Sequence, residues 1–573
     1  MTRPVALLSS GTVAFALSFG GGAAAHPYLL FGPEDEPALA VRVQSGVPGD
    51  AYDSMATFCW FSHLYETGWG KCLEETAFRY RMTGDQSFVQ SAAWTLAQVV
   101  TTAPSALPVS SYPEWCAPVA VAYDLIYDQL SDVERQAVLA WLEEYAVELW
   151  AYLDDGARRP LTHRQVAAYG ALGIAALAIR PDSTHPGVAL WLDASADQLA
   201  QVAFADVYNP GGSCDGGYGV SAYGAPLAIR FAEAYRREVG SDLLAGANIE
   251  QAPAWNVYGW LPHGDHPSLG ATHSLPGVSF GAEHLLLVGR TSDPFGKWGW
   301  HQVHGPSGLD AIEPQLAISA LLPVALWYPV EVPDIADPVV AGYPLDRFFP
   351  DTANPVDGHV GTAVGRGGLA VLRNGWSADS VALLFKVSDE WQPGSRNDSS
   401  SLLLSAYGAQ MAKAPPQFAG LEQRDDQNVV LVGAHNDDAS ERTTYGGELT
   451  KMVSSRLAGY ARADGRYPAG DHAQGDPEDL TDDVWTPLER ADRTVALVRG
   501  PRPYAIVADD ETGAKVVVPS LCIGCHLCTL ACPFGTAFAP ASVAKTELEP
   551  AVKCNLCGGE PACAIVCPTQ AIE

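Results

Sequence analysis

The chain has 573 residues, too many for a single hydrophobic core, and we expect it to divide into three or four domains. Because 47% of the residues are hydrophobic and only 17% are charged, most of the chain must fold. Sixty-six acidic against 34 basic residues give a net charge of −32, which argues against nucleic acid or an anionic membrane surface as a partner. An acidic polysaccharide would require a locally basic cleft.

The first 25 residues have the pattern of a secretory leader. Arg3 precedes an apolar stretch over 5–19, and the segment ends in the small residues 22–25. This pattern predicts a signal peptide cleaved after Ala25, and a short membrane anchor fits less well because small residues interrupt the apolar stretch. No later segment reaches the roughly 20 apolar residues that a membrane span requires. We therefore expect an exported protein, periplasmic or extracellular, with no membrane span.

From residue 26 to about residue 330 the apolar residues recur with the period of helices. Ser131 and Glu134 form a capping box, in which each side chain bonds the other residue's amide. Hairpins of such helices close into an incomplete toroid, which we expect over 26–340. The segments with helical period, separated by Gly, Pro or Asp, are 73–81, 88–100, 118–127, 133–153, 165–179 and 188–207.

From about residue 360 the apolar period changes to two, which predicts strands. The segments 368–376 and 381–386 are expected to pair across a short turn, and further strands are predicted at 401–404, 429–432, 495–499 and 504–507. Such strands form packed antiparallel sheets. We expect a β-sandwich over 341–514. Because the pattern stops near Lys515, this sandwich is expected to be truncated and to leave an open sheet edge.

Four cysteines lie in the part of the chain before the C-terminal segment: Cys59, Cys72, Cys116 and Cys214. In an exported protein they allow one or two disulfides. Cys59 and Cys116 have apolar helical surroundings, in which a buried free thiol is an equally good prediction.

The other eight of the twelve cysteines lie in the last 52 residues. They form the runs C-x2-C-x2-C-x3-C-P and C-x2-C-x5-C-x3-C-P. In two-cluster 4Fe-4S proteins, three thiolates of such a run hold one cluster and the fourth, before the proline, reaches the other. A disulfide knot or a zinc site fits two matched runs poorly. The spacing predicts one cluster on Cys522, Cys525, Cys528 and Cys567, and a second on Cys554, Cys557, Cys563 and Cys532.

Residues 515–573 therefore resemble the two-cluster bacterial ferredoxin module found in electron-transfer subunits of larger oxidoreductases. The resemblance implies a small α+β domain, two 4Fe-4S clusters and a redox partner protein. Export and these clusters are in tension, because clusters are inserted in the cytoplasm and no Arg-Arg pair precedes the apolar stretch. Three explanations stay open: an unusual fusion, a leader that is not cleaved as expected, or a reading frame that joins unrelated pieces.

Two segments of the helical part are candidates for acid–base chemistry. Thr162 and Gln165 form a second capping pattern, which places His163 in the first turn of a helix, where the helix dipole keeps an imidazole neutral. A glycine-rich turn then runs into a helix that carries Tyr218 and Tyr223 close together. The plain alternatives are a solvated surface histidine and two aromatic residues that serve only to pack helices.

Several of these segments resemble secreted heparinase II/III-like polysaccharide lyases over about residues 26–510. They are His-Pro-Tyr-Leu-Leu-Phe at 26–31, Tyr-Asp-Leu-Ile-Tyr-Asp at 123–128, His163, and Asp-Gly-Gly-Tyr at 215–218. The resemblance implies a multidomain chain in which an all-α (α/α) toroid precedes an antiparallel β-sandwich, with substrate between them. It also implies a catalytic tyrosine, Tyr218 or Tyr223, for β-elimination from a uronic acid in an acidic polysaccharide or oligosaccharide.

The resemblance fails in the predicted sandwich. Where the family has two histidines of a His-x-His-x-Asp segment, alignment on Asp398 places Gly394 and Arg396, and Ala414 replaces a later family aspartate. We expect the family's structural zinc to be absent, while the guanidinium of Arg396 can pair with a substrate carboxylate. Two functions follow: a zinc-free polysaccharide lyase, or an iron–sulfur electron-transfer subunit whose lyase-like body is a degenerate binding scaffold.

Overall fold

The computed structural model describes residues 26, 29–62, 69–104, 112–153, 163–208, 217–262, 264, 280–310, 319–350, 368–386, 402–412, 448–464, 492–500 and 502–510. The predicted leader, Arg396, the strand predicted at 429–432 and the cysteine-rich segment therefore lie outside the described residues.

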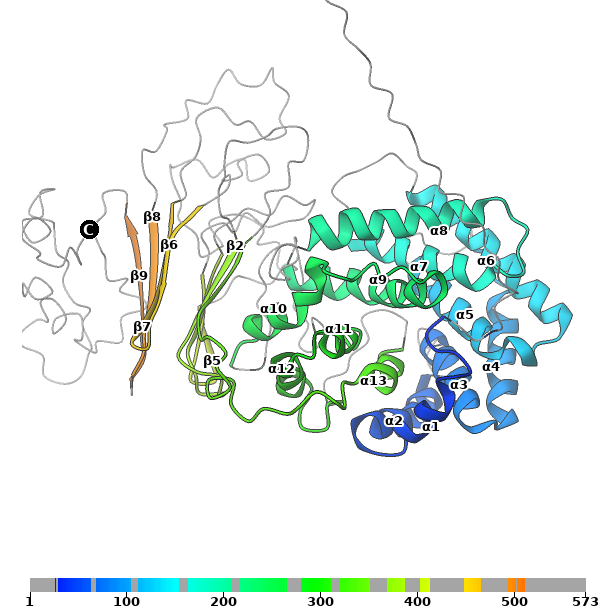
Figure 1. The fold of residues 1–573 in the computed structure, drawn as a ribbon, viewed down its shortest axis with the longest axis horizontal. Coiled ribbons are helices and arrows are strands. Elements are labelled where there is room, and N and C mark those ends of the chain that lie inside the picture. The colour runs from blue at the N-terminus through cyan, green and yellow to red at the C-terminus, as the bar shows by residue number, and fades with distance from the viewer. Residues whose placement is uncertain are drawn as a thin grey trace, which may run out of the picture.

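Helices form the described chain up to Trp327 (Figure 1). The helical period predicted over 26–330 is thus confirmed. None of the helices in the described ranges has the length and apolar character that crossing a bilayer requires. The helices are α1 (Glu36–Arg42), α2 (Gly46–Ser62), α3 (Trp69–Thr83), α4 (Gln86–Val99), α5 (Tyr112–Ile126), α6 (Asp132–Leu153), α7 (His163–Ile179), α8 (Gly187–Gln198), α9 (Gly217–Val239), α10 (Ala252–Gly259), α11 (His284–Thr291), α12 (Pro294–His304) and α13 (Leu321–Trp327), with the short elements η3 (Tyr127–Gln129), η4 (Leu199–Val207) and η5 (Asn248–Gln251).

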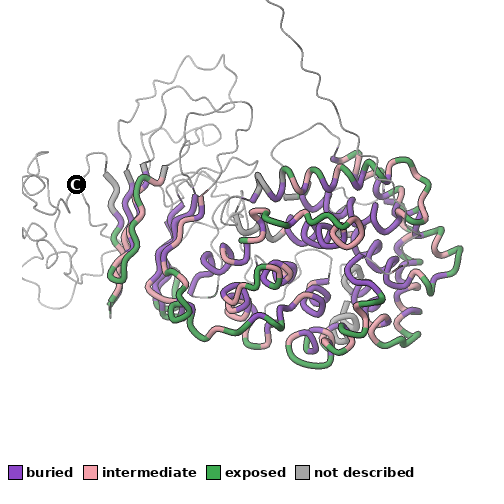
Figure 2. Tube along the Cα trace, in the orientation of Figure 1, coloured by how far each residue is buried: buried purple, intermediate pink, exposed green. Residues whose placement is uncertain are grey.

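Two layers of helices alternate along the chain. Helices α3, α5, α7 and α9 pack side by side, while α4, α6 and α8 pack over them. Helix α7 lies between α5 and α9 and is covered by α6 and α8, so every residue from Val166 to Ile179 is buried (Figure 2). This position explains why α7 is apolar or small on all faces instead of amphipathic.

A fully buried arginine joins helices that are distant along this row. The Arg230 guanidinium on α9 donates to Glu74 Oε1 on α3 at 2.8 Å and to Glu283 Oε1 beside α11 at 2.9 Å. It also donates to the carbonyl of Ser319, whose own amide donates to Glu74 Oε2 at 2.7 Å. The Ser319 hydroxyl in turn accepts from the amide of Leu322 in α13. One buried ion-pair network thus joins α3, α9 and the start of α11.

Local signals set most of the helix ends. The amide of Ser131 donates to Glu134 Oε2 at 2.8 Å, and the Glu134 amide donates to Ser131 Oγ at 3.4 Å, so the predicted capping box is confirmed. The Ser131 hydroxyl also donates to Glu134 Oε2 at 2.6 Å, and the hydrogen bonds from this hydroxyl and from the Ser131 amide lower the pKa of Glu134. Helix α5 begins at Tyr112, six residues before the predicted start, because the helix accommodates Pro118 in its interior. The segment predicted as one helix over 188–207 is α8 followed by the π-helix η4.

The remaining described residues form two antiparallel sheets, as the change of period predicts. The first has the order β1-β2-β3-β4-β5 and the second the order β6-β7-β8-β9. Strand β1 precedes the predicted start of the sheets near residue 360. The strands are β1 (Arg347–Pro350), β2 (Gly368–Arg373), β3 (Ala382–Lys386), β4 (Leu402–Ala406), β5 (Ala409–Ala412), β6 (Glu448–Ser454), β7 (Ala458–Asp464), β8 (Asp492–Val498) and β9 (Tyr504–Asp510).

The first sheet is covered on both faces. Leu369 and Val371 of β2 belong to the core that the helices share, whereas Ala370 and Leu372 belong to a second core with Val495 and other residues of the second sheet. Because alternate side chains of a strand point to opposite faces, each face of β2 meets a different layer. All six residues of β2 are therefore buried.

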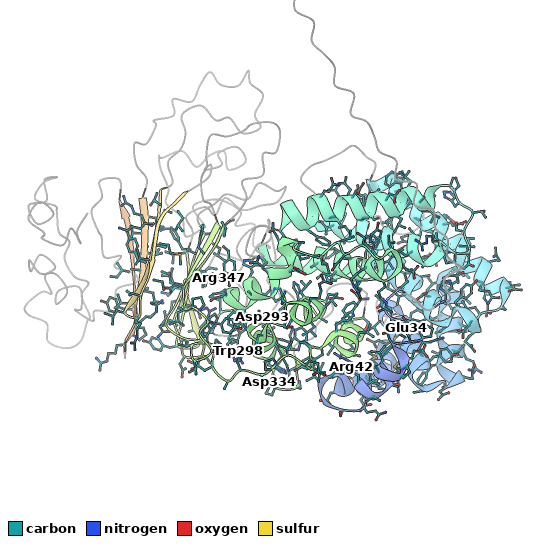
Figure 3. The ribbon with its side chains drawn as sticks, viewed as in Figure 1. Glu34, Arg42, Asp293, Trp298, Asp334 and Arg347 are labelled. Carbon is teal, nitrogen blue, oxygen red and sulfur yellow. The ribbon has the colours of Figure 1, made fainter. Side chains whose placement is uncertain are left out.

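Aromatic side chains fix the first sheet against the helices. The ring of Tyr258 on α10 lies 5.4 Å from Phe295 on α12, 5.5 Å from Phe349 on β1 and 5.2 Å from Trp376 beyond β2. The buried Arg373 Nη2 donates to the Tyr258 carbonyl at 2.9 Å. Figure 3 shows the same side of the helical region, with Asp293, Trp298 and Arg347 next to the sheets. The helices and the first sheet thus share one continuous packed interface.

Candidate functional site

The structure places the three candidate residues of the helical part on two neighbouring helices. His163 is the first residue of α7, as the capping pattern predicts, and Tyr218 and Tyr223 lie in the first turns of α9. The side chain of Tyr223 is half-buried and packs against the helical core. The side chains of His163 and Tyr218 lie outside the described part of the structure, whereas the backbones of α7 and α9 give the positions of all three residues along the two helices.

Two glycines of α7 define how α7 and α9 are aligned. A Cβ built on Gly170 would lie 2.6 Å from the carbonyl carbon of Leu227, and one built on Gly173 would lie 2.3 Å from the ring of Phe231. Gly170 contacts Leu227, and Gly173, later on α7, contacts Phe231, later on α9. The two helices therefore run in the same direction. The close approach requires glycine, because any side chain at position 170 would overlap the backbone of α9.

This alignment brings the predicted residues to the same end of the helix pair. His163 lies seven residues before Gly170, and the position seven residues before Leu227 on α9 is Val220. At about 1.5 Å of rise per residue, His163 is therefore level with a point between Tyr218 and Tyr223, within about 5 Å along the axis of each.

Replacing Gly170 by alanine is expected to force α7 and α9 apart. The added methyl would meet backbone atoms of Leu227 and Ala228, which cannot move aside as a flexible side chain can. Overpacking of this kind costs about 1–3 kcal/mol in the free energy of unfolding. Urea unfolding measures the loss, and any activity of the α7–α9 end should fall with it.

Gly289 provides the matched control, because it is also a helical glycine but a Cβ there would meet only Pro329 Cβ at 3.8 Å. Gly289→Ala is expected to be neutral, or to stabilise by up to about 1 kcal/mol through helix propensity. Equal stability of the two alanine variants would contradict the alignment of α7 and α9 described above.

His26 and the segment 123–128 lie far apart in the sequence, and the structure brings them together. His26 Nδ1 donates to Asp124 Oδ1 at 2.7 Å, and the imidazole stacks on Tyr127 with 4.0 Å between ring centres. The hydroxyl of Tyr127 donates to Asp182 at 2.8 Å, and that of Tyr123 donates to the same carboxylate at 3.0 Å. Burial and the Asp182 hydrogen bond raise the pKa of Tyr127, so its phenol stays a donor.

This histidine cluster lies at the opposite end of the helix row from His163. Asp124 is near the end of α5, and Asp182 follows the end of α7. Nineteen residues separate Asp182 from His163, and the helical part of that span is about 25 Å long. We therefore assign the cluster to anchoring the N-terminal segment. The role of Asp182 could not be predicted from the sequence, because no local pattern joins it to residue 26.

Arg396 and all eight cysteines of the predicted cluster ligands lie outside the described residues, as do the positions that correspond to the family's zinc ligands. Of the other four cysteines, Cys116 is a buried free thiol within α5. Its apolar surroundings raise the pKa of this thiol, as expected for an inert structural cysteine.

Comparison with known proteins identifies the C-terminal segment independently of the structure. Residues 515–537 match the model of the 4Fe-4S binding domain. The chain is 41% identical over 63 residues to the aliphatic sulfonate oxidoreductase, polyferredoxin-like subunit, of Pyrococcus furiosus, which is 11% of this chain and 34% of that protein. It is 38% identical over 71 residues to the thiosulfate reductase electron transfer subunit PhsB of Salmonella typhi, again 11% of this chain and 34% of the relative. The match thus spans about a third of each relative's length.

Solved structures similar to this chain include heparinase III, with a TM-score of 0.45 and 12% identity over 76% of this chain and 61% of that chain. A mutant of heparan sulfate lyase HepC from Pedobacter heparinus gives a TM-score of 0.42 and 12% identity over 78% of this chain and 62% of that chain. This chain thus spans about three fifths of each of these solved structures.

Proposed function

We propose that the chain is an exported polysaccharide lyase-like protein that acts on or binds uronate-containing polysaccharide, and that it carries an electron-transfer segment with two 4Fe-4S clusters at its C-terminus. The observation that carries the first part is the parallel alignment of α7 and α9. It places a histidine at a helix start level with two tyrosines, which are the groups that β-elimination requires.

The chemistry assigned to this end is a proton transfer in two parts. The C5–H bond of the uronate breaks and its electron pair forms the C4–C5 double bond, while the C4–O bond breaks and the leaving oxygen receives a proton. Tyr218 or Tyr223, once a neighbour has activated it as a phenolate, takes the C5 proton and then, as the phenol, donates that proton to the leaving oxygen. His163 is its neutral partner, because the positive end of the α7 dipole disfavours an imidazolium.

Arg396 is assigned to the substrate carboxylate. A guanidinium offers two parallel N–H donors to a carboxylate, and the pair lowers the cost of the negative charge that develops as the C5 proton leaves. The histidines that the family uses at this place are Gly394 and Arg396 here. We therefore propose that elimination proceeds without zinc and is slower than in a lyase with the complete set of residues.

The architecture we infer is an incomplete toroid of helices followed by a β-sandwich. In support, helix α13 packs on α2 and α3, α11 packs on α13, and Arg230 links α9 to α3 and to the start of α11. These contacts follow a cyclic order. The inner helices all contribute to one core, as hairpins wrapped around a common axis would.

For the C-terminal segment, the donor set supports iron rather than a disulfide framework. Eight cysteines in two runs supply two sets of four thiolates, with Cys522, Cys525, Cys528 and Cys567 on one cluster and Cys554, Cys557, Cys563 and Cys532 on the other. Such clusters accept and donate single electrons, so a redox partner protein is part of the proposal. The leader over 1–25 supports export of the chain.

The lyase activity is tested by the ultraviolet absorbance of the unsaturated product, measured on alginate, heparan-type and pectin-type substrates with and without a chelator. We expect slow turnover of at least one uronate polymer, unchanged by the chelator. Strong activity that the chelator abolishes would contradict the zinc-free assignment, and binding without turnover would favour the second candidate function below.

The second candidate is an iron–sulfur electron-transfer subunit whose body is a catalytically degenerate binding scaffold. Two observations favour it: the 4Fe-4S model matches residues 515–537, and the family's sandwich histidines are replaced. The lyase-like body would then bind carbohydrate and hold the clusters near a surface. Turnover of any uronate polymer by the purified chain would exclude this reading.

A further inference from the structure

A pocket lies away from the α7–α9 end. It has a volume of about 550 Å³, is open to solvent on one side, and is lined by residues of α1, α9 and α13, with apolar walls that include Phe31, Leu39, Leu326 and Trp327. Figure 3 shows Arg42, another of its lining residues, beside α13 at the lower edge of the helical region. Volumes of this size are typical of sites for small molecules.

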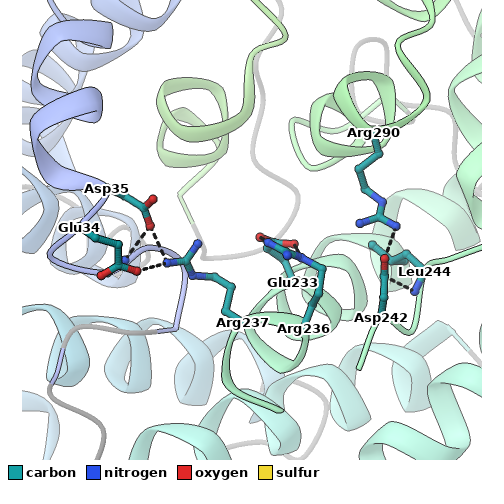
Figure 4. Close-up of polar contacts among 9 residues, drawn as sticks. Glu34, Asp35, Glu233, Arg236, Arg237, Asp242, Leu244 and Arg290 are labelled. Atoms are coloured by element: carbon teal, nitrogen blue, oxygen red, sulfur yellow. Dashed lines mark hydrogen bonds and ion pairs between the residues drawn. The ribbon is translucent and has the colours of Figure 1, made fainter. Parts of the chain in front are cut away.

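The charged residues on the pocket wall are held in place by internal partners. Arg237 pairs with Asp35 at 2.5 Å, and Glu233 pairs with Arg236 at 2.6 Å (Figure 4). The Arg42 Nε donates to the Ala325 carbonyl at 3.0 Å. Because these side chains are already bonded, little conformational entropy would be lost when a ligand enters. The wall is therefore a preformed surface rather than a group of loose surface charges.

Three other lining groups are available to a ligand. They are the half-buried indole of Trp327, the exposed carboxylate of Glu331 and the exposed hydroxyl of Ser45. Within the described ranges none of these three side chains has a hydrogen bond, an ion pair or a ring contact, and Glu331 acts on Arg42 only through its charge. An aromatic face thus stands beside a hydrogen-bond acceptor and a group that both donates and accepts.

We propose that this pocket binds a neutral pyranose unit of an oligosaccharide. A pyranose has an apolar C–H face, which packs on an aromatic ring, and a rim of hydroxyls, which donate to carboxylates and exchange hydrogen bonds with other hydroxyls. Trp327 supplies the ring, Glu331 the acceptor and Ser45 the hydroxyl.

The charges of the wall select a neutral sugar over a uronate. Arg237 is paired with Asp35, and the positive charge of Arg42, which donates to the neutral Ala325 carbonyl, is balanced by the nearby Glu331 carboxylate. A uronate carboxylate would therefore find no uncompensated positive charge on the wall, and the net charge of −32 opposes its approach. The pocket and the α7–α9 end would thus recognise different parts of one mixed polysaccharide.

The two sites are separated along the same helix. Arg237 lies fourteen residues after Tyr223 on α9, which corresponds to about 20 Å along the helix axis. The pocket proposal rests on its own lining residues and requires no turnover of uronates. Failure of the binding experiment below would therefore leave the elimination assay unaffected, and the converse also holds.

The test is saturation-transfer NMR and calorimetry on the full-length chain with maltotriose, cellotriose and triacetylchitotriose, each compared with trigalacturonate. We expect at least one neutral trisaccharide to bind, and Trp327→Ala to weaken its affinity by at least about tenfold, as truncation of a central aromatic contact does. Glu331→Gln is expected to raise the affinity for trigalacturonate, because it leaves the positive charge of Arg42 without its balancing carboxylate.

Trp94→Ala is the matched control, because Trp94 is 59% exposed on α4 and does not line the pocket. It should leave binding unchanged, and circular dichroism should show that both alanine variants are folded. Absence of binding by all three neutral trisaccharides, or equal weakening in the two alanine variants, would overturn the proposal. Preferential binding of trigalacturonate that Trp327→Ala abolishes would overturn the assignment to neutral sugars.

Discussion

Replacing Arg230 by methionine is expected to lower the free energy of unfolding by about 3–5 kcal/mol, which is the usual loss when one partner of a buried ion pair is removed. Arg230 and Glu74 are both fully inaccessible to solvent, and Glu283 is only 5% exposed. Burial raises the pKa of Glu74, and the attraction of Arg230 opposes that rise. Without the guanidinium, the two carboxylates would face each other in the core with no counter-charge.

The same substitution at an exposed ion pair provides the control. Arg135 pairs with Asp132 one helical turn away, and the Asp132 side chain is 91% exposed. Arg135→Met should cost at most about 1 kcal/mol. Urea unfolding followed by circular dichroism measures both variants. A loss at Arg230 no larger than that at Arg135 would show that the buried network does not hold α3, α9 and α11 together.

Removing one acid–base group at the α7–α9 end is expected to reduce elimination by about a hundred- to ten-thousand-fold, the usual contribution of a positioned proton-transfer group. Tyr223→Phe and Tyr218→Phe delete only the hydroxyl, and one of the two should show the full loss. His163→Ala removes the neutral partner and should show a loss in the same range. The measurement is the initial rate of unsaturated product, with protein folding checked by circular dichroism.

Tyr235→Phe is the control for these substitutions, because Tyr235 is a half-buried tyrosine of the same helix that packs on Phe231, away from the first turns of α9. Loss of the Tyr235 hydroxyl should leave the rate of elimination unchanged. Activity unaffected by all three substitutions at the α7–α9 end would show that the site lies elsewhere. Loss of activity in Tyr235→Phe as well would point to a general effect on α9 rather than to chemistry.

Local patterns predicted much of the fold because the signals that set helix and strand ends are local. The Ser131 and Glu134 capping box starts α6 at Asp132, one residue before the predicted start. The switch from a helical to an alternating period separates α13 from the sheets. Strands β5, β6 and β7 were missed, since polar and small residues such as Gln410 and Gly459 interrupt their apolar pattern.

Long-range contacts could not be predicted in the same way. Arg230 meets partners that are 53 and 156 residues away, and no spacing rule joins such positions. His26 and Asp124 both lie in segments that resemble one family, but no sequence pattern indicates the hydrogen bond between them across 98 residues. The candidate acid–base residues were found in sequence because a glycine-rich turn and a helix start are local features. That they lie at the same end of the α7–α9 pair depends on the contact between Gly170 and Leu227, which no sequence pattern indicates.

The most direct test of the account is the iron and sulfide content of the full-length chain after anaerobic reconstitution, followed by spin-resonance spectra of the reduced sample. We expect about eight irons and as many sulfides per chain, because the spacing of the eight cysteines fixes two 4Fe-4S clusters. Cys522→Ser and Cys554→Ser should each remove one cluster and leave about four irons. A chain without iron, or with zinc and no sulfide, would contradict the account.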